Sequence, residues 1–330
     1  MIVRVFGKTY WYIPVLLFFA GLLLWMTAFL DPAATLSYIY PANAPLYKLF
    51  YPLIQGNPMA ALITAYLLLV FQAFLIDYVA TSGNFTDRYS SLTGLIYILL
   101  MSSGQHMLSP HPMVFSNIFL LLACLKIFKV YSKQERILEI FNAAFLTGIA
   151  GLIYMPSLAV FLVLIVSLAV YNMFSLRTLL ASLMGLAAPY FFIGTYYIMT
   201  GTLQLRLGEF SIDPEPWMLI MQMPNTLEQI FIFAMAAFVL LAVIRLRLVF
   251  MADKIILVRR HVQVLLLLFF VILFSYFVAG GYAGLHHAMV SIPLSIVLSV
   301  FFYDIRNDRL KELLFFIFLS LIIAGRILVW

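Results

Sequence analysis

Uninterrupted apolar runs recur along this chain and constrain its fold more than any other feature. An α-helix of about 20 apolar residues spans the hydrocarbon core of a bilayer, whereas the strands of a transmembrane barrel alternate apolar and polar residues. Hydrophobic residues make up 65% of the chain and charged residues 10%, which leaves too little polar surface for a water-soluble domain. We therefore predict an all-α, polytopic transmembrane helical bundle with about eleven spans. The predicted spans are residues 11–30, 59–78, 91–107, 112–130, 137–154, 157–173, 176–200, 226–250, 262–280, 287–303 and 310–329.

The distribution of Lys and Arg residues predicts on which side of the membrane each loop lies. With the N-terminus in the cytoplasm and alternating spans, 16 of the 19 Lys and Arg residues fall on the cytoplasmic side, and the outer side holds Lys48, Arg206 and Arg326. Cytoplasmic loops of membrane proteins carry such an excess of basic residues. We therefore expect residues 1–330 to form a single integral membrane domain, N-in and C-out. The short loops favour the bacterial cytoplasmic (inner) membrane. The first apolar run is too long for a signal peptide, so we expect an uncleaved helix.

Two predicted outer segments are long, residues 31–58 and 201–225. The first is rich in proline and aromatic residues, which suit the membrane–water boundary, and residues 46–54 are expected to form a short interfacial helix. In the second, Leu203, Leu205 and Leu207 alternate with polar residues. That alternation predicts a short strand or an interfacial strip.

Composition and motifs exclude several classes of function. The net charge of +6 is carried by short loops, so it is a topology signal and predicts no nucleic-acid partner. The motifs G-x-G-x-x-G, G-x-S-x-G and H-E-x-x-H, which mark common cofactor and catalytic sites, are absent from the sequence. Motifs therefore identify no cofactor, and its identity is unknown at this point. Cys124 is the single cysteine, which excludes an internal disulfide. Asp77 and Arg326 lie near span ends and are expected to snorkel. No chain of ionisable residues within the spans indicates a proton relay.

Four of the five histidines fall on the predicted outer side. Together with the carboxylates of residues 201–225 they could bind a divalent metal ion, because imidazole and carboxylate are common ligands of such ions. The alternative is that polar residues gather at loop ends because water is there. Adjacent residues on a regular element point in different directions, so at most one of the neighbours His286 and His287 is an inward ligand. The candidate ligands are His106, His111, His286 and His287.

Asp31 is the carboxylate that we single out. It follows the first span directly and precedes Pro32. A partly desolvated carboxylate at the membrane boundary can act as a general base toward a hydroxyl acceptor; the alternative is an Asp-Pro pair that merely ends a helix. Arg206 and Lys48 are candidates for binding a lipid phosphate. For Arg206 the alternative is a loop ion pair with a neighbouring carboxylate.

The sequence resembles the GT-C class of polyprenyl-linked glycosyltransferases, mainly over its first 200 or so residues. The resemblance rests on Asp31 after the first span, on the long first outer loop, on eleven spans in short hairpins, and on the spacing through Ser109-Pro110-His111-Pro112 and residues 152–177. It implies that Asp31 is catalytic and that the donor is a sugar on a polyprenyl phosphate. The chain departs from the class in having no Asp-Asp or Asp-Glu pair in the first outer loop and no large soluble C-terminal domain. It is also similar to uncharacterised bacterial multi-pass inner-membrane proteins, a likeness that implies no activity.

Two other functions stay open at this point. The protein could be a non-catalytic accessory or scaffold subunit of an envelope or secretion complex, with membrane-protein partners, or a carrier of a lipid or another apolar solute. Membrane lipids are partners in every case, and a polyprenyl-phosphate lipid is the partner that the transferase requires. We expect a lateral groove leading to Asp31 in a transferase and a filled bundle in a scaffold.

Overall fold

The structure, a computed structural model, describes residues 2–7, 10–32, 44–86, 90–131, 136–206, 226–251, 254–276 and 283–328, without the side chains of residues 2, 53–55, 105–106, 226–232, 283–285 and 327–328. All regular structure in these ranges is helical. The elements in chain order are α1 (Ile2–Phe6), α2 (Ile13–Leu30), α4 (Tyr47–Gly56), α5 (Pro58–Ser82), α6 (Leu92–Met101), the 3-10 turn η1 (Gln105–Leu108), α7 (Pro112–Lys129), α8 (Arg136–Ile153), the 3-10 turn η2 (Met155–Leu158), α9 (Ala159–Val170), α10 (Leu176–Met199), α11 (Leu203–Arg206), α13 (Thr226–Arg245), the π-helical turn η4 (Leu246–Phe250), α14 (Ile256–Ser275), α15 (Ala283–Asp304) and α16 (Asp308–Leu328).

Within the described residues, eight helical segments are long and apolar enough to cross a membrane, which is compatible with a multi-pass membrane protein. They comprise α2, α5, α7, α8, α10, α13 with η4, α14 and most of α15. Each of the three remaining predicted spans also contains a helix. Of these, α6 and the segment formed by η2 and α9 are short, and α16 carries charged residues in its first two turns. The count of eleven spans and the N-in orientation stay predictions.

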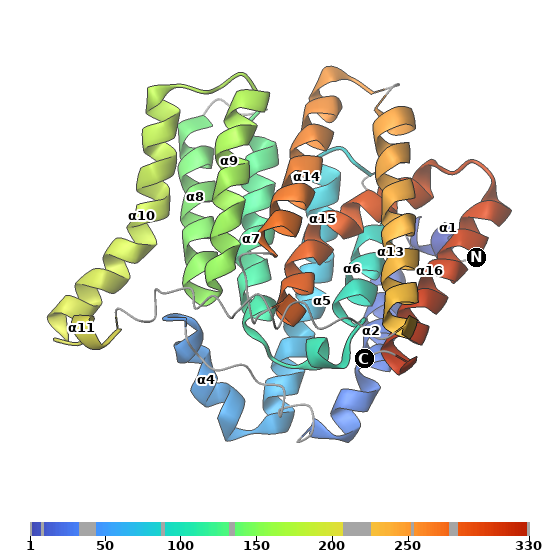
Figure 1. Cartoon of the computed structure of the whole chain (residues 1–330), viewed down its shortest axis with the longest axis horizontal. Coiled ribbons are helices and arrows are strands. Elements are labelled where there is room, and N and C mark those ends of the chain that lie inside the picture. Colours follow the sequence, from blue (N-terminus) through green and yellow to red (C-terminus); the bar gives the residue numbers. More distant parts are fainter. Residues whose placement is uncertain are drawn as a thin grey trace.

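The long helices run alongside one another and expose two ends (Figure 1). At one end lie α4, α11 and the last turn of α16; we call this the α4 end. At the opposite end α9 joins α10, and α13 with η4 ends near the start of α14 (Figure 1). We call this the basic end, because α7, α8, α10, η4 and α14 all carry basic residues there, namely Lys126, Lys129, Arg136, Arg177, Arg247, Arg259 and Arg260.

Three helices are each followed by an Asn or Gly residue in the left-handed backbone conformation. Asn84, Asn172 and Gly201 have φ values of 57°, 56° and 66°. Asn and Gly tolerate this conformation better than other residues. After each of them the chain donates a backbone hydrogen bond back to the helix, as in Thr202 N to Tyr197 O at 2.9 Å. This Schellman pattern satisfies the last carbonyl groups and stops α5, α9 and α10 at defined positions.

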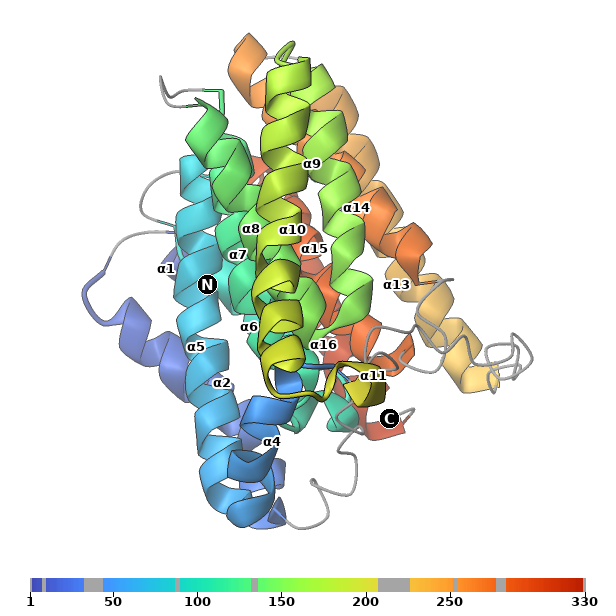
Figure 2. The same cartoon turned by 90° about the vertical axis from the view of Figure 1, so that its left-hand side faces the viewer.

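Small residues allow α8 and α10 to pack closely. A Cβ atom on Gly185 would lie 2.4 Å from Phe141 O, and one on Gly148 would lie 2.8 Å from the Pro189 side chain. Close approach through small residues is a common way for helices to associate in membranes, where water does not drive them together. The outer surface of α10 is exposed and apolar, with Met184, Phe191 and Phe192 among its exposed side chains. Figure 2 looks onto this flank of the bundle.

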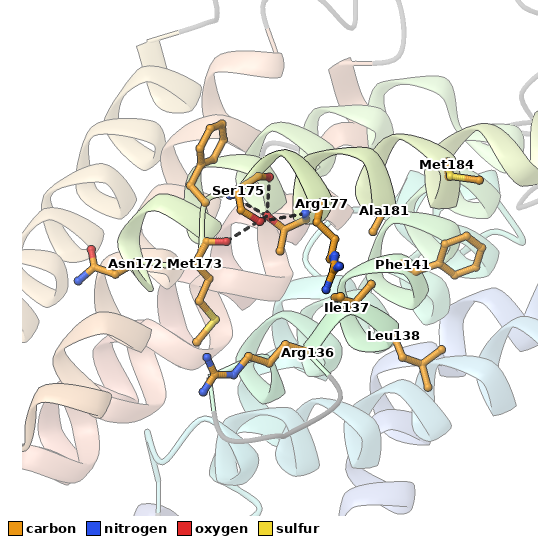
Figure 3. Close-up of a pocket in the computed structure, with 12 residues that line it drawn as sticks. Arg136, Ile137, Leu138, Phe141, Asn172, Met173, Ser175, Arg177, Ala181 and Met184 are labelled. Carbon is orange, nitrogen blue, oxygen red and sulfur yellow. Dashed lines mark hydrogen bonds between the residues drawn. The ribbon is translucent and has the colours of Figure 1, made fainter.

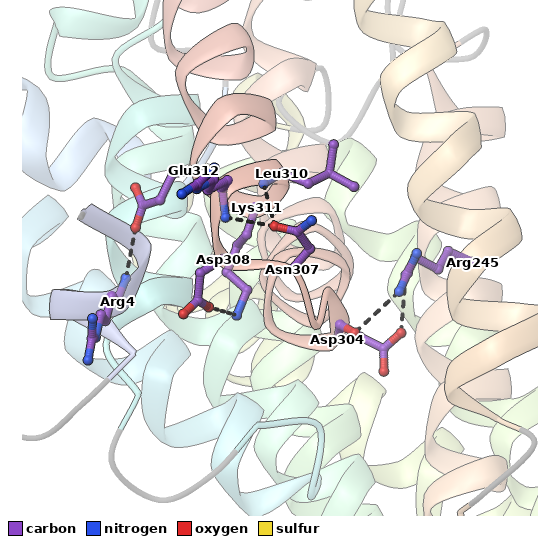
Figure 4. A network of polar contacts seen from close by, with 9 residues as sticks. Arg4, Arg245, Asp304, Asn307, Asp308, Leu310, Lys311 and Glu312 are labelled. Atoms are coloured by element: carbon purple, nitrogen blue, oxygen red, sulfur yellow. Dashed lines mark hydrogen bonds and ion pairs between the residues drawn. The ribbon is translucent and has the colours of Figure 1, made fainter.

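The corner between α15 and α16 is held by polar contacts (Figure 4). Asn307 Oδ1 accepts hydrogen bonds from the backbone N–H groups of Arg309 and Leu310, at 3.0 and 3.3 Å, and so caps α16. Arg245 Nε donates to Asp304 Oδ2 at 3.1 Å, which links α13 to α15. The corner therefore fixes three of the helices that enclose the cavity described below.

Several predicted boundaries differ from the structure. The short helix expected at residues 46–54 is confirmed as α4, and its place at the membrane interface stays a prediction. The short strand expected around Leu203 is wrong, because residues Leu203–Arg206 form one helical turn directly after α10. The predicted span 91–107 contains an α-helix only up to Met101, since Ser102, Ser103 and Gly104 interrupt it. Helix α14 begins at Ile256, six residues before the predicted start of its span, because basic residues are accommodated within its first turns.

Candidate functional site

An apolar cavity of about 480 Å³ lies between α13, α14, α15 and α16. Its walls are mainly aliphatic and aromatic side chains, such as Val239, Phe269 and Ile322. Its few polar side chains include Ser103, just after α6, and His287, in the first part of α15. Helix ends and η1 come together there at the α4 end (Figure 1). The volume falls within the roughly 300–1,000 Å³ range of small-molecule sites, so the cavity suits an apolar ligand with a polar group at one end.

The last turns of α2 are attached to the wall of this cavity by two side chains. Trp25 Nε1 donates to Ser102 Oγ at 3.1 Å, next to the lining residue Ser103. On the other side, Arg326 follows the lining residue Gly325. Its Nη1 donates to the backbone oxygen of Leu24 at 2.7 Å. The end of α2 is therefore fixed next to the polar end of the cavity.

Asp31 lies at this attached end of α2. It is the residue that ends the helix, and its backbone N–H donates to Thr27 O at 3.3 Å. Thr27 Oγ1 in turn accepts a hydrogen bond from Arg326 Nη2 at 2.5 Å. The Asp31 side chain is exposed. Asp31 thus lies about one helical turn beyond the contact that joins α2 to the cavity wall.

Arg326 is a site residue whose role the sequence analysis missed. We expected it to snorkel to the membrane surface, but it is half-buried and its guanidinium lies between α16 and α2. The sequence did contain a signal, because an arginine inside an apolar run is expensive to place in a membrane and marks a functional or structural contact. The two hydrogen bonds use two of its five N–H groups, so the guanidinium retains capacity to bind an anion.

The other two cations predicted at the site lie on different elements. Arg206 ends α11, and its guanidinium lies 5.9 Å from the centre of the Tyr197 ring. The helix α11 stands on the flank of the bundle opposite α2 (Figure 1), so the structure does not bring Arg206 to Asp31. Lys48 is half-buried on α4. The hydroxyl of Tyr47, next to it, donates to Pro110 O at 2.9 Å and anchors α4 to the segment before α7.

The predicted histidines have different surroundings. His286 is buried: its Nδ1 lies 3.3 Å from the Tyr154 hydroxyl, and its Nε2 lies 2.9 Å from both Ser275 Oγ and Ile272 O. This pattern fits a proton on Nε2 and none on Nδ1. A histidine bonded in this way connects three segments of the bundle and is not a general base toward Ser275. His287 is on the more exposed side of α15 and lines the cavity, so the expectation that the two point in different directions is confirmed.

The metal site stays a prediction. His111 is buried as the N-cap residue of α7. Among the residues that the structure describes, no three His, Cys, Asp or Glu side chains lie close enough to hold one metal ion. The side chain of His106, and residues 207–225 with their three predicted carboxylate ligands, lie outside the described residues.

A buried polar network fixes the side of α15 that faces the cavity. Tyr97 OH donates to Gln72 Oε1 at 2.6 Å, and Asn117 Nδ2 donates both to Tyr97 OH at 3.0 Å and to Ala288 O at 2.9 Å. Ala288 follows His287 directly. Since buried polar groups are costly unless paired, the network sets the rotation of α15 against α6 and α7 and thereby helps to orient His287.

Comparison with known proteins gives no further guide, because no model of a protein family, no curated protein and no solved structure matches this chain.

Proposed function

We propose that this chain is a multi-pass integral membrane protein that binds a lipid-linked substrate, with the hydrocarbon part of the lipid in the cavity between α13, α14, α15 and α16. The single observation that carries this proposal is the cavity itself. It is apolar along most of its walls and has Ser103 and His287 at the α4 end. A hydrocarbon chain gains affinity from each methylene that it buries, and the polar end of the lipid would lie toward those two residues.

We further propose that the basic end faces the cytoplasm and the α4 end faces outward. The described helices place Lys129, Arg136, Arg177 and Arg259 toward one end of the bundle. At the other end are Asp31 and the three cations that the sequence assigns to the outer side. This asymmetry is the one that the positive-inside rule relates to orientation, so the substrate would be met at the outer leaflet.

The phosphate of a polyprenyl-phosphate sugar is the head group that we assign to the site. Arg326 supports this choice, because it follows the lining residue Gly325 and its guanidinium donates only part of its N–H groups to α2. We assign the phosphate contact to Arg326 in preference to Arg206, since α11 lies on the other flank. Lys48 on α4 is left as a second candidate cation.

The reaction that we propose is transfer of the sugar with inversion, as the resemblance to GT-C enzymes implies. Asp31 takes the proton from the acceptor hydroxyl. The oxygen of that hydroxyl forms a bond to the anomeric carbon, while the bond between this carbon and the phosphate oxygen breaks. The polyprenyl phosphate leaves with the electron pair of that bond. Asp31 lies at the attached end of α2, and its exposed carboxylate is accessible to an acceptor hydroxyl, which supports its assignment as the base.

The test separates lipid binding from transfer. Binding of a polyprenyl phosphate to the purified full-length protein is measured by native mass spectrometry, and the pools of lipid-linked sugar are measured in cells that express each variant. We expect V239W, which fills the cavity from α13, to weaken binding by about tenfold or more. The matched control L241W places the same bulk on the exposed face of the same helix and is expected to bind normally.

Asp31→Asn is expected to bind the lipid normally but to abolish transfer. Asp308→Asn serves as its control, because it removes one carboxylate at the α15–α16 corner, away from the site. Unchanged lipid-sugar pools at full expression of the Asp31 variant would refute the transferase and favour a carrier. Equal binding by V239W and the wild type would refute the use of the cavity and favour a scaffold.

A further inference from the structure

A second cavity lies at the basic end of the bundle, about 1,030 Å³ in volume, between the first turns of α8 and α10 and the turn that follows α9. Arg136 and Arg177 both line it. Ile137, Leu138 and Phe141 of α8 and Met184 of α10 form apolar parts of its wall (Figure 3). We propose that this cavity binds an anionic phospholipid of the adjacent leaflet. It is separate from the cavity of the proposed function, and the proposal does not depend on that function.

The shape of the cavity follows from the tight packing of α8 against α10. Gly185 brings the two helices together at Phe141, where a Cβ atom would be only 2.4 Å from the backbone oxygen. Between this contact and the helix ends, the small Ala181 leaves open the space that Leu138 and Met184 border. An acyl chain fits such a space, since it is apolar and adjoins the exposed, lipid-facing side of α10.

The position of Arg177 is set by a well-ordered turn. Asn172 ends α9 in the left-handed conformation, and Met173 N donates to Leu168 O at 2.7 Å. Three residues later, Ser175 caps α10: its Oγ accepts from Thr178 N at 3.2 Å, and Thr178 Oγ1 accepts from Ser175 N at 3.0 Å. These bonds, drawn in part in Figure 3, hold the start of α10 and direct Arg177 toward α8.

The charge around the cavity favours an anion. No carboxylate is among the described residues that line it, and residues 132–135 are outside the described part of the chain. The acidic residue in the first turn of α8, Glu139, is buried against α7, where it binds Lys126 Nζ at 3.0 Å. Two guanidinium groups above an apolar space match the phosphate and the acyl chain of one phospholipid, and basic pockets between membrane helices bind such head groups.

The experiment compares lipids that differ only in the head group. Native mass spectrometry of the full-length protein is performed with dioleoyl phosphatidylglycerol and dioleoyl phosphatidylcholine at equal concentrations. We expect the wild type to prefer the anionic lipid, and the variant R136Q/R177Q to bind it about tenfold more weakly. The control R247Q/R259Q removes the same charge at the same end, from exposed residues that do not line the cavity, and is expected to keep the preference.

A second variant keeps the charges and fills the space. A181F is expected to weaken binding of the anionic lipid although Arg136 and Arg177 are kept. This variant tests the acyl part of the site even if the double variant does not fold. Glycerol 3-phosphate, the head group without chains, is expected not to displace the lipid. Equal losses in the cavity and control variants, wild-type binding by both cavity variants, or displacement by glycerol 3-phosphate at equal concentration would each overturn the proposal.

Discussion

Replacing Arg326 by Gln is expected to loosen the attachment of α16 to the end of α2. Two hydrogen bonds are lost, to Leu24 O at 2.7 Å and to Thr27 Oγ1 at 2.5 Å. Hydrogen bonds to charged groups contribute about 1.5–3 kcal/mol, whereas polar contacts between membrane helices average about 0.6 kcal/mol. Arg326 is half-buried and Thr27 is exposed, which favours the lower values. We therefore expect the free energy of unfolding to fall by about 1–2 kcal/mol.

The assay is a double-mutant cycle in detergent micelles with denaturant. The free energies of unfolding of Arg326→Gln, Thr27→Val and the combined variant are compared with the wild type. If the contact exists, the combined loss is smaller than the sum of the single losses by about 0.5–1 kcal/mol. Lys48→Gln, which removes a cation on α4, is the control and is expected to change stability little. Strict additivity of Arg326→Gln and Thr27→Val would refute this contact and the placement of Asp31 that follows from it.

Three further predictions concern single positions. Gly185→Ala is expected to destabilise the protein by about 1–3 kcal/mol, because the added methyl group meets a backbone oxygen of α8. The control Gly194→Ala, on the same helix, meets nothing within 4 Å and is expected to be neutral or stabilising. Thermal unfolding of both variants checks this prediction. Gln72→Leu is expected to cost about 1–3 kcal/mol, since it leaves the buried Tyr97 hydroxyl without its acceptor; Q72L/Y97F should recover part of that loss, and no recovery would count against the network. Burial is the main cause that raises the pKa of the Tyr47 hydroxyl above its usual value, and the electrostatic effect of Tyr51 raises it further. The folded state therefore keeps this proton at higher pH than the unfolded state, and stability should decline as pH rises above about 10; unfolding measured from neutral to alkaline pH should show a shallower decline for Tyr47→Phe.

The helices were predictable from the sequence because a chain in a bilayer has to satisfy its backbone hydrogen bonds within each spanning segment. Apolar runs therefore locate the helices well, and the aromatic stretch before α5 correctly predicted the short helix α4. Short patterns were less informative. The alternating leucines after Gly201 predicted a short strand or an interfacial strip, but Leu203 and Leu205 lie in a helical turn. Four residues are too few to distinguish a period of 2 from one of 3.6.

The site was predictable only in part, because its residues come from distant parts of the chain. Asp31 and His287 were identified from their positions at span ends, and both lie at the α4 end. The contact of Arg326 with α2 joins residues about 300 positions apart, and the spacing of apolar runs does not give the order of helices in the membrane. The cavity arises where side chains of four helices fail to fill a space, which no local pattern records.

The measurement that tests the central claim most directly is photo-crosslinking with a polyprenyl phosphate that carries a photoreactive group in its chain, followed by mass spectrometry of the labelled peptides. Our account predicts labels concentrated on the cavity side of α13, α15 and α16, at residues such as Val239, Leu294 and Ile322, and competed away by unlabelled polyprenyl phosphate. Labels spread evenly over exposed surfaces such as that of α10, without competition, would contradict it.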